Sequence, residues 1–211
     1  MHAELLKLQK VRIIPVLALP NVADAAPVAE ALVKGGLPCA EVTFRTDAAV
    51  EAIRIMAKRG DMQVGAGTVL KVDQVKAAVD AGATFIVSPG INPKVVKYCV
   101  DNGIPITPGT ANPTDIEVAL DHGLEVVKFF PAETLGGLEA LQAFSAPYNM
   151  MRFIPTGGIG PKNLLDYLKF PKVIACGGTW MVKAELIAEK KFDQIASLSR
   201  EAVQLAAGSR S

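Results

Sequence analysis

The sequence predicts an α/β fold, a single (β/α)8 barrel of the TIM type with short loops. Eight short apolar runs alternate with helical patterns along the 211-residue chain. Most of these runs are continuously apolar, which is typical of parallel strands that are covered on both faces. Their spacing of about 20 to 27 residues fits one strand and one helix per unit. We therefore expect one barrel domain over residues 1–207 and a flexible tail over residues 208–211.

The expected strands follow one another with helix signals between them. In chain order they cover residues 12–19, 38–44, 62–68, 84–88, 105–107, 125–130, 151–155 and 172–175. Two neighbouring helices repeat the same pattern, in which an Asn-Pro pair (Asn92-Pro93 and Asn112-Pro113) starts the helix and a glycine ends it. An open, doubly wound sheet is the alternative, but it usually has a Gly-rich turn after the first strand. Pro20 and Asn21 occupy that place here, so we expect the closed barrel.

Composition excludes several classes of protein. The formal net charge of +1 gives no basic surface for nucleic acid or for an acidic membrane. The longest apolar run, residues 13–20, is too short to span a bilayer, and the N-terminus lacks the features of an export signal. We therefore expect a cytoplasmic protein. Three scattered cysteines and two histidines make a poor disulfide framework and a poor metal site, so we expect neither a metal nor a cofactor.

A lysine interrupts the sixth apolar run. Lys128 follows Val126-Val127 and precedes Phe129-Phe130, where burial of its charge would cost several kcal/mol unless it is paired. Burial favours the neutral amine, which is the form that attacks a ketone to give an imine. A snorkelling or ion-paired lysine is the structural alternative, and it is the commoner case for a lysine in such surroundings.

Polar residues also alternate along the second run. A period of two places Glu41, Thr43 and Arg45 on one face of the strand. If that face points into the barrel, a carboxylate and a guanidinium join Lys128, a set suited to imine chemistry on an acid substrate. A structural ion pair between Glu41 and Arg45 is the alternative interpretation.

Glycines follow the later strands. Gly157-Gly158 and Gly177-Gly178 come after the seventh and eighth runs, where barrels commonly bind a phosphate through backbone N–H groups. Gly65 to Thr68 closes the third run, and its glycines would let a ligand approach the backbone. Each motif could also be an ordinary tight turn.

Six motifs together resemble one family in order and spacing. They are Glu41-Val42-Thr43-Phe44-Arg45-Thr46, Gly65-Ala66-Gly67-Thr68, Ser88-Pro89-Gly90, Lys128-Phe129-Phe130-Pro131-Ala132-Glu133, Pro155-Thr156-Gly157-Gly158 and Gly177-Gly178-Thr179-Trp180. The chain resembles, over nearly its whole length, the 2-keto-3-deoxy-6-phosphogluconate aldolases, class I aldolases that often also cleave 4-hydroxy-2-oxoglutarate. The resemblance implies a homotrimer that cleaves such keto acids to pyruvate and an aldehyde through a lysine imine.

The resemblance also implies a role for individual residues. Lys128 would form the imine and Glu41 would be the general acid/base. The substrate-binding residues would be Arg45 and Thr68 at the pyruvate carboxylate, Pro89, Phe130 and Thr156 elsewhere, and Gly157, Gly158, Gly178 and Thr179 at the phosphate. Relatives usually have serine where Thr179 stands, so the sequence leaves the tightness of phosphate binding open.

Two other functions remain open at this point. The first is a related pyruvate-forming aldolase that acts on a non-phosphorylated or epimeric 2-keto-3-deoxy acid. The second is a barrel without catalytic activity that binds a phosphorylated metabolite. The first differs in its preference for phosphate, and the second differs in whether Lys128 reacts with pyruvate.

Overall fold

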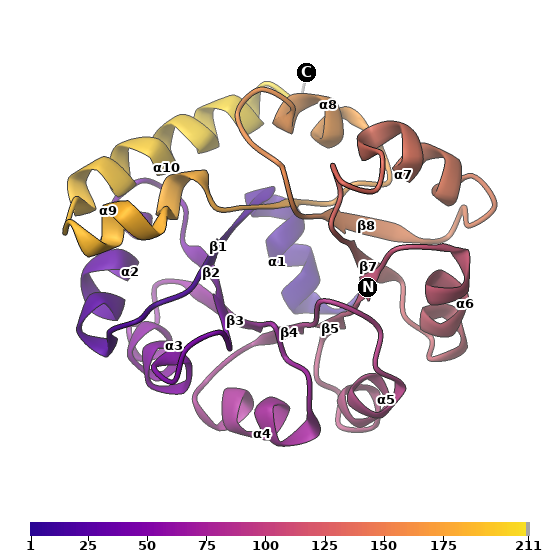
Figure 1. Ribbon diagram of the computed structural model, residues 1–211, viewed down its shortest axis with the longest axis horizontal. Coiled ribbons are helices and arrows are strands. Elements are labelled where there is room, and N and C mark those ends of the chain that lie inside the picture. Colours follow the sequence, from indigo (N-terminus) through magenta and orange to yellow (C-terminus); the bar gives the residue numbers. More distant parts are fainter. Residues whose placement is uncertain (210–211) are drawn as a thin grey trace.

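Parallel strands form a closed ring with helices around it in the computed structural model, which describes residues 1–209 (Figure 1). The strands are β1 Ile13–Leu17, β2 Cys39–Thr43, β3 Gln63–Gly67, β4 Phe85–Val87, β5 Ile106–Thr107, β6 Gly109–Thr110, β7 Val126–Phe129, β8 Arg152–Pro155 and β9 Cys176–Gly178. The α-helices are α1 Ala3–Val11, α2 Ala25–Lys34, α3 Ala49–Lys58, α4 Val72–Asp80, α5 Pro93–Asp101, α6 Pro113–Asp121, α7 Gly137–Ser145, α8 Leu164–Lys169, α9 Ala184–Ala188 and α10 Phe192–Ala207, and the 3-10 helices are η1 Val22–Asp24 and η2 Trp180–Val182.

The ring closes through two short connections between the sheets. One sheet has the order β5-β4-β3-β2-β1-β9, and the other has the order β6-β7-β8. Only Pro108 separates β5 from β6, and its carbonyl accepts a hydrogen bond from the N–H of Lys128. Isolated bridges pair Phe153 with Val173 and Thr156 with Gly177, which joins β8 to β9. Because β5 and β6 act as one interrupted strand, the ring has eight positions, and the predicted barrel fold is confirmed.

The eighth strand lies later in the chain than the sequence predicts. Residues 172–174 hydrogen-bond with Phe153 of β8, whereas β9, Cys176–Gly178, pairs with β1. The prediction ended the strand at Ala175 because paired glycines are typical of loops. Here glycine is required within the strand, because a Cβ on Gly177 would lie 2.4 Å from Thr156 Oγ1 and one on Gly178 would lie 1.9 Å from the Trp180 ring.

Two predicted helix starts are confirmed in detail. The side chain of Asn92 accepts a hydrogen bond from the N–H of Lys94, and that of Asn112 accepts one from the N–H of Asp115. In both helices the proline occupies the first turn, where its missing N–H costs no hydrogen bond.

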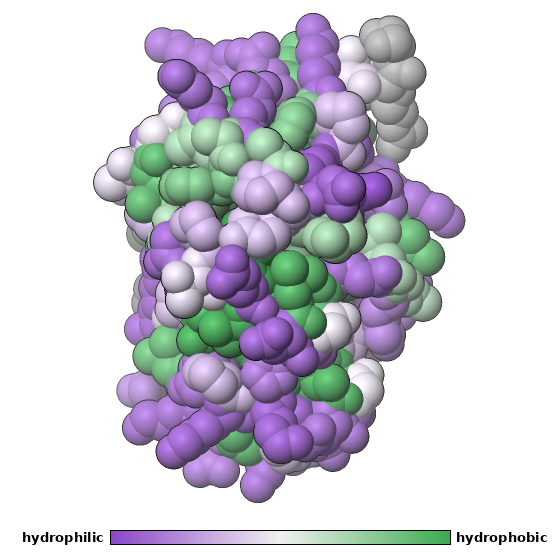
Figure 2. All heavy atoms as spheres, turned by 90° about the vertical axis from the view of Figure 1, so that its right-hand side faces the viewer, coloured by the Kyte–Doolittle hydropathy of each residue, from purple (hydrophilic) through white to green (hydrophobic). Residues whose placement is uncertain are grey.

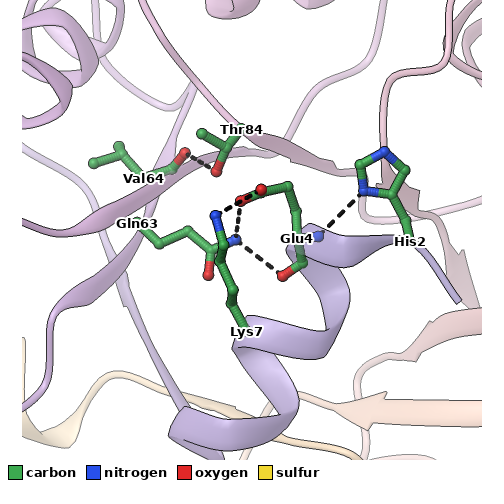
Figure 3. Close-up of polar contacts among 6 residues, drawn as sticks. All are labelled: His2, Glu4, Lys7, Gln63, Val64 and Thr84. Atoms are coloured by element: carbon green, nitrogen blue, oxygen red, sulfur yellow. Dashed lines mark hydrogen bonds and ion pairs between the residues drawn. The ribbon is translucent and has the colours of Figure 1, made fainter. Parts of the chain in front are cut away.

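Helix α1 closes the N-terminal end of the barrel. Its Leu5 and Leu8 pack in a separate interior cluster with side chains that point inward from the strands, namely Ile14, Cys39, Phe85, Val87, Val126, Ile154, Ile174 and Ala175. Polar contacts fix the helix to the start of β3, where Gln63 Nε2 donates to the main-chain and side-chain oxygens of Glu4 (Figure 3). Lys7 Nζ donates to the same carboxylate. The opposite, C-terminal end of the ring is therefore the accessible one.

Two further predictions concern membrane-spanning segments and the C-terminal tail. None of the helices in residues 1–209 combines the length and hydropathy needed to cross a bilayer. Gly208 and Ser209 follow α10, and Ser209 Oγ donates to the carbonyl of Ala206. The predicted tail, 208–211, extends beyond the described residues, because Arg210 and Ser211 lie outside them, and it stays a prediction together with the domain bounds.

Leu8→Ala tests the role of α1 in closing the barrel. Leu8 is fully buried, so its truncation should lower the free energy of unfolding by about 2–5 kcal/mol, from lost burial and a cavity. Leu6→Ala on the same helix is the matched control, because Leu6 is 42% exposed and should change the value by about 0.5 kcal/mol at most. Urea denaturation measures both, and equal effects would show that α1 does not pack into the barrel.

Candidate active site

Lys128 lies inside the barrel on β7. Along this strand Val127 and Phe129 point outward to the helices, while Val126 and Lys128 point inward. Lys128 is only 5% exposed. Its Nζ lies 3.5 Å from Glu41 Oε1 and 4.8 Å from the centre of the Phe130 ring. The buried charge is thus compensated by a carboxylate, and an aromatic face shields it further.

Glu41 extends from β2 into the barrel interior, where its carboxylate meets Lys128. It is 3% exposed, and its Oε1 accepts no hydrogen bond within residues 1–209. The carboxylate fits because the neighbouring strand β3 ends in a glycine, since a Cβ on Gly67 would lie 2.2 Å from Oε1. Glu41 therefore pairs with Lys128, and the Glu41–Arg45 ion pair that the sequence left open is not found in the described part of the chain.

A cavity of about 670 Å³ opens at the C-terminal end of the ring. It brings together most of the residues that the sequence singled out, namely Arg45, Lys128, Phe130, Thr156, Gly157, Gly158, Gly178 and Thr179. The lining also includes Val16, Leu17, Ala18, Thr43, Ile159, Gly177, Val182, Lys183, Ala184 and Glu185. The location agrees with the general position of active sites in barrels of this kind.

Three predicted residues do not line this cavity: Glu41, which lies below it as the partner of Lys128, and Thr68 and Pro89. Thr68 directly follows Gly67 and has a positive φ of 55°, a conformation that a residue with a Cβ rarely adopts. Pro89 follows β4, and its carbonyl oxygen lies against Gly109, where a Cβ would come within 2.1 Å. Gly109 pairs with Lys128 between β6 and β7. Thr68 thus follows β3, beside the strand of Glu41, and Pro89 follows β4, beyond the strand that pairs with that of Lys128.

The Gly157-Gly158 turn is held in place from the segment after β7. The N–H of Ala132 donates to the carbonyl of Thr156, and the N–H of Glu133 donates to that of Gly157. Both glycines have positive φ, 99° and 79°, and a Cβ on Gly158 would lie 2.4 Å from Glu133 Cγ. The N–H groups of Gly157 and Gly158 have no acceptor within residues 1–209. This turn thus presents free donors to the cavity.

The hydroxyl group of Thr156 lines the cavity without a hydrogen-bond partner among the described residues. Thr156 Oγ1 is buried and makes no hydrogen bond within residues 1–209. Buried polar groups are nearly always hydrogen-bonded, so such an atom in a cavity lining is suited to a ligand. The same holds for Glu41 Oε1, which has only its charged neighbour.

Several cavity residues were not singled out by the sequence. The sequence places Thr43 on one face with Glu41 and Arg45 but assigns it no role, and in the structure its hydroxyl donates to the carbonyl of Leu17. The same period-two rule would have found Val16 on β1 and Ala18 directly after it. Lys183 lies between η2 and α9, and Glu185 lies in the first turn of α9; no strand or helix pattern indicates that they reach the cavity.

The three cysteines lie apart from this chemistry. All are free and buried, and burial raises the pKa of the Cys39 and Cys176 thiols far above its ordinary value. Burial raises the pKa of Cys99 to about 12. The thiols therefore stay protonated at neutral pH and are poor nucleophiles. Residues 1–209 contain no cluster of His, Cys, Asp and Glu arranged for a metal ion.

A family model and the sequences of known proteins point to the same family of enzymes. Residues 5–198 match the family model described as KDPG and KHG aldolase. The chain is 52% identical over 199 residues to the 2-dehydro-3-deoxy-phosphogluconate aldolase of Treponema pallidum, which covers 94% of this chain and 95% of that protein.

Solved structures agree with this. The 2-keto-3-deoxy-6-phosphogluconate aldolase of Zymomonas mobilis ZM4, crystallised with 3-phosphoglycerate, is 41% identical with a TM-score of 0.89, covering 95% of each chain. KDPG aldolase of Legionella pneumophila, with pyruvate captured as a covalent carbinolamine, is 35% identical with a TM-score of 0.91, covering 95% of this chain and 98% of that one.

Proposed function

The chain belongs to the family of KDPG and KHG aldolases, and we propose that it uses Lys128 as the imine-forming amine and Glu41 as the acid/base. It is a carbon–carbon lyase that cleaves 2-keto-3-deoxy-6-phosphogluconate to pyruvate and D-glyceraldehyde 3-phosphate, and 4-hydroxy-2-oxoglutarate to pyruvate and glyoxylate. The observation that carries the assignment of residues is the buried pair beside the cavity, with Nζ and Oε1 3.5 Å apart.

The pair explains how the amine becomes reactive. Lys128 must lose a proton before its nitrogen can attack the C2 ketone. Glu41 is its charged neighbour, and Oε1 has no hydrogen bond to lose when it takes that proton. Addition of the amine gives a carbinolamine. Glu41 returns the proton to the carbinolamine hydroxyl, which leaves as water, so a protonated imine and the Glu41 carboxylate remain.

Glu41 then acts on the substrate itself. The carboxylate removes the proton from the C4 hydroxyl, the C3–C4 bond breaks, and the electron pair moves into the imine to give an enamine of pyruvate. The aldehyde leaves. The same carboxyl returns a proton to C3, and water hydrolyses the imine to release pyruvate and free Lys128. A group that takes and returns a proton in this way supplies general acid–base catalysis.

The cavity lining supports most of the proposed binding residues, whereas Thr68 and Pro89 are proposed on the family resemblance alone. Arg45 and Thr68 hold the pyruvate carboxylate in this proposal, with Phe130, Pro89 and Thr156 around the reacting carbons. The phosphate lies at Gly157, Gly158, Gly178 and Thr179. Unpartnered N–H groups in the Gly157-Gly158 turn support that placement, because such groups bind anions well.

Assembly and location are separate parts of the proposal. We propose a homotrimer, on the basis of the family resemblance. Apolar side chains lie among polar ones on the side of the molecule that carries α6 (Figure 2). Val100 in α5 and Met150 after α7 are 41% and 57% exposed, which supports burial in an assembly.

The proposed location is the cytoplasm. The three free thiols support it, because they suit a reducing compartment, and cell fractionation would test it.

Trapping with pyruvate tests the assignment of Lys128. After incubation with pyruvate and borohydride, the protein should carry one reduced adduct, on the peptide that contains Lys128. Lys183 is the internal control, because it lines the same cavity but is exposed and away from Glu41. Mass spectrometry of the peptides locates the adduct. No mass gain at Lys128 would favour a barrel that binds metabolites without catalysis.

Glu41→Gln tests the acid/base. The substitution keeps the shape but removes the proton acceptor, so kcat for cleavage should fall by about 10²–10⁴-fold. Adduct formation with pyruvate should remain detectable, because the nucleophile Lys128 is unchanged. A coupled assay for pyruvate measures the rate, and circular dichroism checks the fold. Turnover equal to that of the wild type would remove Glu41 from the mechanism.

Sedimentation equilibrium tests the assembly. The chain has a mass of 22.2 kDa, so a homotrimer should sediment with three times that mass. Met150→Glu introduces a charge at the most exposed apolar side chain, and it should weaken the trimer if Met150 lies in the interface. A monomer mass for the wild type at micromolar concentration would contradict the proposal.

A further inference from the structure

More cationic than anionic side chains line the cavity. They are Arg45, Lys128, Lys183 and Glu185. Lys128 is compensated by Glu41, and the proposed function assigns Arg45 to the substrate carboxylate. Lys183 is the remaining cation in this lining, and its side chain makes no ion pair or hydrogen bond within residues 1–209. No part of the reaction described so far uses it.

Lys183 sits on the chain segment that follows the proposed phosphate-binding residues Gly178 and Thr179. The N–H of Val182 donates to the carbonyl of Thr179, with donor and acceptor 3.0 Å apart, so this segment turns back on itself. The carbonyl of Lys183 accepts hydrogen bonds from the N–H groups of Leu186 and Ile187 at the start of α9. The main chain is thereby fixed, whereas the side chain is exposed and free to move toward a ligand.

We propose that Lys183 selects substrates that carry a phosphate at the end remote from the keto acid, and that Glu185 opposes this selection. The inference rests on the proposed function, because it assumes that the phosphate lies beside Gly157 and Thr179. The groups at that place are uncharged N–H and hydroxyl donors, which also bind a neutral hydroxyl group. A cation distinguishes the two, because a phosphate carries almost two negative charges at neutral pH and a hydroxyl carries none.

The matched experiment compares two substrates that differ only in the phosphate, 2-keto-3-deoxy-6-phosphogluconate and 2-keto-3-deoxygluconate. Lys183→Met should lower kcat/KM for the phosphorylated substrate by about fivefold to tenfold, through a higher KM. A loss of this size lies between the effect of an exposed ion pair and that of a charge-assisted hydrogen bond. The value for the other substrate should stay within about twofold, because no interaction with it is lost.

Further variants separate charge from shape. Lys183→Arg keeps the charge and should keep the selectivity. Glu185→Gln should raise kcat/KM for the phosphorylated substrate by about twofold, by removing a repelling charge. Lys191→Met is the control, because Lys191 is an exposed lysine that pairs with Glu189 and does not line the cavity. It should leave both substrates unchanged.

The outcomes distinguish this inference from the proposed function. If Lys183→Met still forms the pyruvate adduct on Lys128 but has the wild-type preference between the two substrates, the inference is wrong and the proposed function stands. An equal loss with both substrates would also overturn it, by assigning Lys183 a structural role. If the wild type forms no adduct, the proposed function fails and the inference fails with it.

Discussion

A lysine and a glutamate share the interior of the barrel, and their mutual compensation is the constraint on which the rest of the site depends. Either charge alone at this depth would be strongly destabilising, whereas the pair, 3.5 Å apart, makes both tolerable. The two residues come from β7 and β2, which are not neighbours in either sheet. Only a closed ring brings their side chains together across its interior, so the fold and the chemistry have the same requirement.

Glycine makes room for this arrangement at each level of the site. Gly67 lets the Glu41 carboxylate enter, Gly177 leaves space for the Thr156 hydroxyl, and Gly158 packs on the stem of Glu133. At each of these positions a single methyl group would displace a polar group of the site. The same close packing leaves Glu41 Oε1 and Thr156 Oγ1 without hydrogen bonds among the described residues, and a bound substrate can supply them.

The two ends of the barrel differ in their relation to water. At the N-terminal end, Leu5 and Leu8 of α1 complete an apolar interior. At the other end the interior becomes polar, from Glu41 and Lys128 outward to Arg45 and Lys183 at the cavity. The buried pair thus lies between a dry core and an open cavity, where its charge is stabilised by its partner while substrate can still reach Lys128.

The amino-acid sequence by itself determined the strand–helix alternation, the barrel, and the shared face of Glu41, Thr43 and Arg45, because these follow from periodicity and local capping. It also indicated Lys128 as unusual, since an ionisable residue among valines and phenylalanines breaks the pattern of a buried strand. Three points were decided only by the tertiary structure. Glu41 pairs with Lys128 rather than with Arg45, β9 includes the two glycines, and Lys183 reaches the cavity. Each depends on contacts between segments far apart in the chain. The space that one segment leaves decides which side chain of another segment fits there, and the local sequence does not determine that space.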